Sequence, residues 1–107
     1  MKVGDYVRTE ISSLNLQRIG KIKKIISEDF IHTDMGTYDK ENIIKSSPNI
    51  IDLIEVGDYV NGRIVDDYIY LDKLGLIGLT ELEKEDEKFI KSIVTKEQFE
   101  AIKYEIK

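Results

Sequence analysis

Short runs of alternating apolar and polar residues dominate the first half of this chain and predict β-strands. A single helical turn is expected at residues 39–42, just before the last of these runs. The polar stretch 10–18 has no clear period, so we expect it to form a long hairpin loop. The predicted strands cover residues 3–9, 19–26, 30–34, 37–38 and 43–45. Five short strands with one turn before the last are typical of an SH3-like barrel.

The second half continues with strand patterns of the same kind. Asn61-Gly62 is a strong signal for a two-residue hairpin turn. The alternating run Tyr68–Leu71 is followed by a turn at Asp72-Lys73. The stretch 74–82 predicts a strand bent at its two glycines, and 89–94 predicts a last strand.

Two helices are expected beside these strands. Ser47 as N-cap, with Pro48 at the first helical position, indicates a short linking helix over residues 48–54. Thr95 and Gln98 have the spacing of a capping box, which indicates the start of a C-terminal helix that packs on the sheet. The apolar positions that follow at helical spacing are Phe99, Ile102 and Ile106.

The pentapeptide Val-Gly-Asp-Tyr-Val occurs twice, at residues 3–7 and 56–60. The first copy reaches Gly20-Lys21-Ile22 after a long loop, and the second continues directly into Gly62-Arg63-Ile64. Aligning these tripeptides places Arg63 in the position of Lys21. We interpret the repeat as the first hairpin of a small barrel built twice.

These patterns predict a mainly β (α+β) fold, in which an SH3-like small barrel is followed by a second β-hairpin lobe, with a short linking helix and a C-terminal helix. The expected division is an SH3-like β unit at 1–46, a linker with the short helix at 47–55, and a second β unit with the C-terminal helix at 56–107. A chain of 107 residues is also short enough for both units to share one compact domain. Small barrels leave edge strands that pair readily, which is compatible with a homo-oligomer.

Composition excludes several classes of protein. The chain has no cysteine, which excludes disulfides and thiolate metal sites. No apolar run approaches the roughly 20 residues that a membrane-spanning helix needs. The first residues enter a strand pattern without the hydrophobic region of a signal peptide. We therefore expect a cytoplasmic protein without membrane contact.

The net charge of −5 is unevenly placed along the chain. Residues 1–53 hold eight Lys/Arg and eight Asp/Glu, whereas residues 54–107 hold eight against thirteen. The overall acidity disfavours direct nucleic-acid binding through phosphate neutralisation. A local anion site remains compatible with it, because residues 8–24 carry five basic side chains against Glu10 alone.

Catalytic and metal chemistry find little support in the residues. P-loop, nucleophile-elbow and metalloprotease motifs are all missing from the sequence. His32 is the sole histidine, and a structural or solvent-facing role is favoured over a catalytic one beside Asp34. The acidic run 81–87 lacks the turn glycine of a calcium loop, which favours a solvated loop over a cation site or an acidic partner-facing patch. We therefore expect no enzyme, no catalytic residue, no metal and no cofactor.

A group of basic and aromatic residues is the best candidate for a ligand surface, since aromatic faces beside arginine can stack a base. The simpler interpretation is that the repeated Val and Tyr fill the barrel and the lysines face solvent. The candidate ligand-binding residues are Tyr6, Arg8, Arg18, Lys21, Lys23, Tyr59, Arg63, Tyr68 and Tyr70.

Two segments carry a resemblance to a known group of proteins. Residues 47–62 (SPNIIDLIEVGDYVNG) and 90–106, containing IVTKEQFEAIKYEI, resemble small uncharacterised proteins of phages and prophages of Gram-positive bacteria. Together they cover about a third of the chain. The resemblance implies an intracellular protein of an infected or lysogenic host cell, and accessory proteins of this kind often antagonise host immunity.

The resulting hypothesis is a non-enzymatic phage or prophage accessory protein. It would antagonise host immunity by binding either a small nucleotide ligand, as a signal, or a host protein. The alternatives are an SH3-like adaptor for nucleic-acid or transcription machinery, and a structural phage component.

Overall fold

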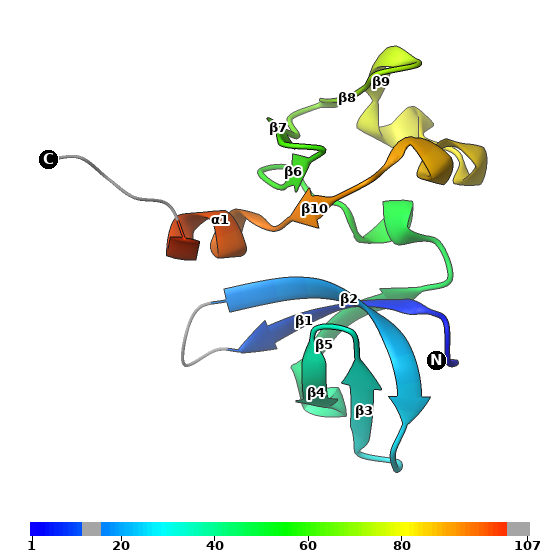
Figure 1. Ribbon diagram of the computed structural model, residues 1–107, viewed down its shortest axis with the longest axis vertical. Coiled ribbons are helices and arrows are strands. Elements are labelled where there is room, and N and C mark those ends of the chain that lie inside the picture. Colours follow the sequence, from blue (N-terminus) through cyan, green and yellow to red (C-terminus); the bar gives the residue numbers. More distant parts are fainter. Residues whose placement is uncertain (12–15, 103–107) are drawn as a thin grey trace, which may run out of the picture.

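The computed structural model describes residues 1–11 and 16–102, and it shows a mainly β protein with short helices and open antiparallel sheets (Figure 1). Five strands form the first unit in the spatial order β4-β3-β2-β1-β5. A 3-10 turn, η2 (Lys40–Asn42), precedes the last strand, and Asp39 caps it by accepting from the backbone N–H of Glu41. The strands are β1 (Tyr6–Ile11), β2 (Leu16–Ile25), β3 (Phe30–Thr33), β4 (Gly36–Asp39) and β5 (Ile43–Ser47).

The hairpin between β1 and β2 is longer than we predicted. Glu10 pairs with Gln17 and Ile11 with Leu16, so most of the stretch 10–18 is strand and the prediction of a long loop is wrong there. Leu16 is buried and Gln17 hydrogen-bonds the Arg8 side chain. Tertiary contacts therefore stabilise a strand that these residue types alone do not favour. Residues 12–15 lie outside the described residues.

Five shorter strands form the second unit in two sheets, with orders β10-β6-β7 and β8-β9. The strands predicted at 74–82 and 89–94 are both shorter than expected, and most of the acidic run 81–87, predicted as a loop, lies in two 3-10 helices separated by residues 82–83. The strands are β6 (Tyr59–Val60), β7 (Arg63–Ile64), β8 (Tyr68–Leu71), β9 (Gly75–Gly78) and β10 (Ile93–Val94). The helices are η3 (Ile50–Leu53), η4 (Leu79–Glu81), η5 (Lys84–Phe89) and α1 (Lys96–Ile102).

The capping box predicted at the start of α1 is confirmed. Gln98 N–H donates to Thr95 Oγ1 and Thr95 N–H donates to Gln98 Oε1, each over 3.1 Å. The linking helix begins later than predicted, at Ile50, as a 3-10 turn. The Ser47 hydroxyl accepts from the backbone N–H of Asn49, which closes a local turn before the helix starts. Ile106, predicted to lie on the C-terminal helix, is outside the described residues.

The repeated pentapeptide builds the same backbone corner in each unit. Gly4 and Gly57 adopt φ angles of 95° and 99°, which favour glycine. Gly4 N–H donates to the Ile22 carbonyl over 2.9 Å, and Gly57 N–H donates to the Val65 carbonyl over 2.8 Å. In both corners the aspartate carboxylate accepts from the backbone N–H three residues earlier.

The correspondence continues through every strand of the two units. Ile31, the second residue of β3, pairs with Tyr38, and Ile69, the second residue of β8, pairs with Ile77 in the same way. The residue after the fourth strand donates its N–H to the residue before the third in both units, Lys40 to Asp29 and Leu79 to Asp67. Each unit then has a 3-10 turn before its fifth strand and a short helix after it. The duplication therefore covers the whole five-strand unit.

The hydrogen bonds also correct the alignment of the two hairpins. Because Ile22 corresponds to Val65, Lys21 corresponds to Ile64 and Arg63 corresponds to Gly20. Our prediction that Arg63 takes the position of Lys21 is wrong by one residue. A shift of one residue in a strand moves a side chain to the opposite face, so the two basic residues do not form equivalent surfaces.

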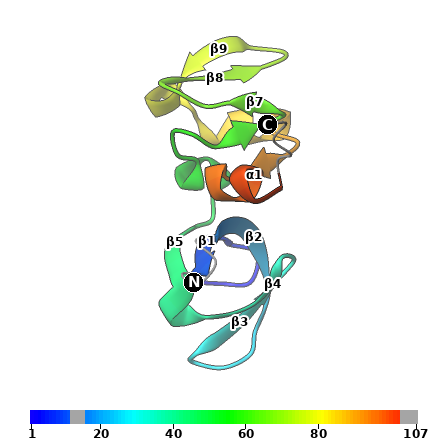
Figure 2. The ribbon, with the colours of Figure 1, turned by 90° about the vertical axis from the view of Figure 1, so that its left-hand side faces the viewer.

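Each unit has its own hydrophobic core. The first core contains Val7, Ile22, Ile31 and Tyr38, and the second contains Ile54, Val60, Val65, Ile69 and Leu71. The buried positions that match between the units are Val7 with Val60, Ile22 with Val65, and Ile31 with Ile69. Helix α1 lies at the boundary between the units (Figure 2), where the Thr95 hydroxyl donates to the Gln17 carbonyl of β2 over 2.6 Å.

A buried ion pair joins the two units. Arg8 follows the first pentapeptide, and its Nη1 and Nη2 donate to Asp58 Oδ2 (2.6 Å) and Oδ1 (3.0 Å) in the second. Arg8 is 1% exposed and Asp58 is fully buried. Nη1 also donates to the Leu53 carbonyl, and Nε donates to Gln17 Oε1. This bidentate geometry is the strongest arrangement available to an arginine–carboxylate pair.

Two further carboxylates surround the same guanidinium. Glu55 Oε2 lies 3.4 Å from Arg8 Nε, and Glu97 Oε2 lies 3.6 Å from Nη2. Burial alone would lower the pKa of Arg8, but the hydrogen bond and charge of Asp58, with the charges of these glutamates, raise it above its ordinary value. The stabilisation from this guanidinium is therefore complete below the ordinary arginine pKa and is lost only in strongly alkaline solution.

The substitution Asp58→Asn removes the carboxylate charge and leaves the Arg8 guanidinium buried without its main partner. We expect the free energy of unfolding to fall by about 3–5 kcal/mol, as for other buried ion pairs broken on one side. Urea unfolding followed by circular dichroism measures this change.

The matched control is Asp5→Asn in the first corner, where the carboxylate accepts from the exposed backbone N–H of Lys2. We expect a loss below about 1.5 kcal/mol, since one hydrogen bond to an exposed group is weakened. Equal losses for Asp5→Asn and Asp58→Asn would contradict the assignment of the junction to the ion pair.

Candidate ligand pocket and the predicted site residues

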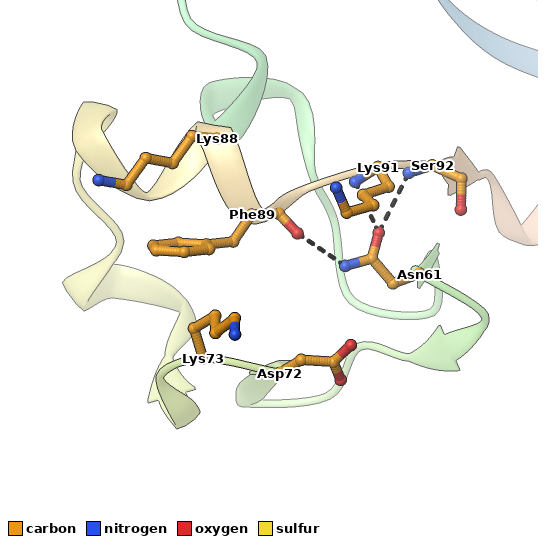
Figure 3. A pocket seen from close by; sticks show the side chains of 7 residues that line it. All are labelled: Asn61, Asp72, Lys73, Lys88, Phe89, Lys91 and Ser92. Carbon is orange, nitrogen blue, oxygen red and sulfur yellow. Dashed lines mark hydrogen bonds between the residues drawn. The ribbon is translucent and has the colours of Figure 1, made fainter.

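A pocket in the second unit is lined by three lysines and one aromatic ring. Its volume is about 600 Å³. The ring of Phe89 lies between the side chains of Lys88 and Lys73 (Figure 3). The lining residues are Asn61, Asp72, Lys73, Lys88, Phe89, Lys91 and Ser92, and we call this set the lysine pocket.

Asn61 fixes one wall of the lysine pocket. It occupies the β6–β7 turn with a φ angle of 52°, a left-handed conformation that asparagine tolerates. Its Oδ1 accepts from the backbone N–H groups of Lys91 (2.7 Å) and Ser92 (3.1 Å), and its Nδ2 donates to the Phe89 carbonyl (2.8 Å). The segment between η5 and β10 is thereby held against the turn, which positions Lys91 and Phe89.

The lysine pocket is electropositive in an otherwise acidic chain. Three lysines against Asp72 leave a local charge of +2, whereas the whole chain has a net charge of −5. Lys88 Nζ lies 5.1 Å from the centre of the Phe89 ring, within the range of a cation–π contact. The three lysines are exposed, so their ammonium groups can reach an anion, while the half-buried ring offers a flat apolar face.

Two of the predicted ligand-binding residues have structural roles. Arg8 was predicted to contact a ligand, but its guanidinium is buried at the junction and hydrogen-bonded to Asp58, Leu53 and Gln17. Tyr59 stacks on Phe99 of α1, with ring centres 4.2 Å apart. Both side chains therefore bind other parts of the chain.

Three other predicted residues do come together. Arg63, Tyr68 and Tyr70 line a shallow groove of about 520 Å³ with Ile64, Asp66 and Leu76. The guanidinium carbon of Arg63 lies 4.1 Å from the centre of the Tyr70 ring. We call this second set the tyrosine groove.

The remaining predicted residues lie on the first unit, apart from both cavities. Lys21 Nζ lies 5.8 Å from the centre of the Tyr6 ring, at the far limit of a cation–π contact. Arg18 Nη1 donates to the Met35 carbonyl over 3.4 Å, and Lys23 is exposed on β2. The predicted basic-aromatic surface is thus divided among the junction, the tyrosine groove and the first unit.

Sequence patterns did not indicate the residues of the lysine pocket. Asn61 follows β6, Asp72 and Lys73 follow β8, and residues 88–92 run from the end of η5 to β10, so three separate segments meet. The Asn61-Gly62 turn was the one available signal, because it was predicted as a hairpin and its side chain organises the wall.

His32 is exposed on β3, and its Nδ1 lies 2.9 Å from the Thr37 hydroxyl. Across residues 1–11 and 16–102, no three His, Asp or Glu side chains are placed to hold a metal ion. Within the same residues, no helix has the length and apolar character needed to cross a membrane.

Two substitutions at Asn61 distinguish the stability that comes from its side-chain hydrogen bonds from the stability that depends on its left-handed backbone. Asn61→Gly removes the three bonds but accepts the left-handed φ, and we expect a loss of about 1–3 kcal/mol in the free energy of unfolding. Asn61→Ala should lose roughly a further 1–2 kcal/mol, because alanine disfavours that φ. Urea unfolding of both variants checks this, and equal stabilities would show that the left-handed turn is not retained.

Comparisons with known proteins add no family or relative to this picture. No family model, no curated protein and no solved structure matches this chain. What the chain does must therefore be argued from its own pockets and charges.

Proposed function

We propose that this chain is a non-enzymatic binding protein whose lysine pocket takes a small anionic ligand of the nucleotide type. The observation that supports this most directly is that Lys73, Lys88 and Lys91 line one pocket with Phe89, with Lys88 Nζ 5.1 Å from the ring centre. Ammonium groups bind phosphate oxygens through charge-assisted hydrogen bonds, and an aromatic face stacks a base. A pocket of about 600 Å³ falls within the usual range for small-molecule sites.

The biological setting of the proposal comes from the sequence. The resemblance of residues 47–62 and 90–106 to phage and prophage proteins favours an accessory protein acting inside a bacterial host. Binding and retaining a nucleotide-type signal would then deprive host immunity of it. Sequestration requires affinity and no chemistry, which agrees with the absence of a recognisable catalytic motif.

An SH3-like adaptor for a host protein is the second candidate. The strand order β4-β3-β2-β1-β5, with η2 before the last strand, is the arrangement expected of an SH3-like fold and supports this candidate. The exposed tyrosine groove supplies a surface of the kind that a protein partner contacts. This candidate and the first use different residues, so one chain can have both activities.

The proposal is tested by thermal unfolding and calorimetry with ATP, GTP, cyclic mono- and dinucleotides and inorganic pyrophosphate. A ligand that binds only the folded state raises the unfolding temperature. Each of Lys73→Ala, Lys88→Ala and Lys91→Ala should weaken nucleotide binding by about tenfold, equivalent to roughly 1.4 kcal/mol. Lys84→Ala is the matched control, since Lys84 is also exposed on η5 but does not line the pocket.

Phe89→Leu tests the ring separately from the charges. Leucine keeps an apolar side chain against the second core, where Phe89 packs, but removes the flat face. We expect weaker nucleotide binding and unchanged pyrophosphate binding. No response to any member of the panel would overturn the proposal, and equal losses for Lys84→Ala and the pocket lysines would show that binding is non-specific.

A further inference from the structure

The two units differ most where their second and third strands meet. In the first unit, seven residues separate Ile22 from Phe30, and β2 uses them to continue alongside β3. In the second unit, only two residues separate the corresponding Val65 and Tyr68. The second unit therefore lacks the stretch that pairs with the third strand.

This difference leaves one edge of β8 unpaired. In the first unit, Lys24 pairs with His32 and Ile25 with Ile31. The corresponding residues of β8 are Tyr70 and Ile69, and β8 pairs with β9 on its other edge. Among the strands that the structure describes, none pairs with β8 at the edge that faces β7. At this edge the Tyr68 N–H donates to Asp66 Oδ1 and the Tyr68 carbonyl accepts from the Asp66 N–H, so the strand-pairing position is Tyr70, two residues on, whose backbone groups can accept another strand.

The tyrosine groove runs along this edge and is unusually apolar for an exposed surface. Its lining includes Arg63 and Ile64 of β7, Tyr68 and Tyr70 of β8, and Leu76 of β9. Ile64 is 60% exposed, Tyr68 55% and Leu76 71%. The groove thus combines apolar side chains, the guanidinium of Arg63 and the carboxylate of Asp66 with an unpaired strand edge.

We propose that the free edge of β8 binds an extended segment of a partner protein by adding it as a strand. The occupant would take the place that residues 23–25 occupy in the first unit, pairing with Ile69 and Tyr70. Large apolar side chains at alternate positions would cover Ile64, Tyr68 and Leu76. A carboxylate beside them would meet the planar guanidinium of Arg63.

The two edge strands of the first unit, β4 and β5, do not fit this description. β5 would bring Lys45 toward Arg63, and the large apolar side chain of β4, Tyr38, is buried in the first core. Asp39 of β4 already caps η2. A partner protein therefore matches the groove better than the first unit of a second copy. The inference is independent of the lysine pocket, because the two sets share no residue.

The experiment is the selection of peptides from a displayed library of random 12-residue sequences, followed by binding measurements by fluorescence anisotropy. Selected peptides should alternate apolar residues and carry Asp or Glu. Amide chemical shifts should change at Tyr68–Leu71 when a selected peptide binds. Inserting the sequence of residues 23–27 between Val65 and Asp66 should supply the missing strand within the chain and weaken binding at least tenfold.

Point variants test the proposal without depending on the folding of the insertion variant. Tyr68→Ser and Arg63→Glu change exposed side chains and should each weaken binding at least tenfold. Phe30→Ser is the matched control, because Phe30 is also exposed at the corresponding position but its strand already pairs with β2; it should bind normally. Failure to select peptides, or selected peptides that bind the insertion variant equally, would overturn the proposal. A dimer that dissociates on insertion would overturn it in favour of a second copy.

Discussion

The arrangement of the two units depends on one buried guanidinium. Arg8 is held by Asp58 from the second unit, by Gln17 from the first, and by the carbonyl of Leu53 from the linking helix. Asp58 in turn accepts from the backbone N–H of Lys96 at the start of α1, over 3.3 Å. β2, the linking helix and α1 thus each hydrogen-bond to one member of this pair. Because a buried charge is costly unless it is paired, the ion pair specifies the relative position of the units more than it adds to stability.

The two units share their core positions and backbone corners but differ in their loops and surface charges. Matching core positions, glycine corners and 3-10 turns occur in both units, although the five strands form one sheet in the first unit and two sheets in the second. The loops between strands differ in length, and their charges differ as well. A shortened connection at Asp66-Asp67 opened a strand edge, while the longer segment through η5 brought lysines around Phe89. Both candidate sites therefore lie in the second unit, where the copy departs from the first.

Local patterns were sufficient to predict most strands, the Asn61-Gly62 turn and the capping box at Thr95, because turn and cap chemistry depends on neighbouring residues. The pentapeptide repeat marks the two matching glycine corners, but its alignment beyond five residues was wrong, since hydrogen bonding and not residue identity sets the register. The site was harder to predict. Arginine is usually exposed, but Arg8 is buried against Asp58, which lies 50 residues away in the sequence. The lysine pocket combines three segments that share no sequence motif.

The contact between the two units is asymmetric: the first unit contributes the arginine and the second contributes the carboxylates. The outer ends of the two units do not have matching groups for the same contact. If a further unit packed on the first unit through the same contact, its arginine would lie near Lys2, which corresponds to Glu55 of the second corner. That arginine would then face a positive charge where Arg8 faces a negative one. At the opposite end, the position of Arg8 is taken by Asn61, whose side chain is already committed to its own turn. A head-to-tail contact that could repeat would build an open filament. Here the same contact stops after two units, so the pairing is self-limiting.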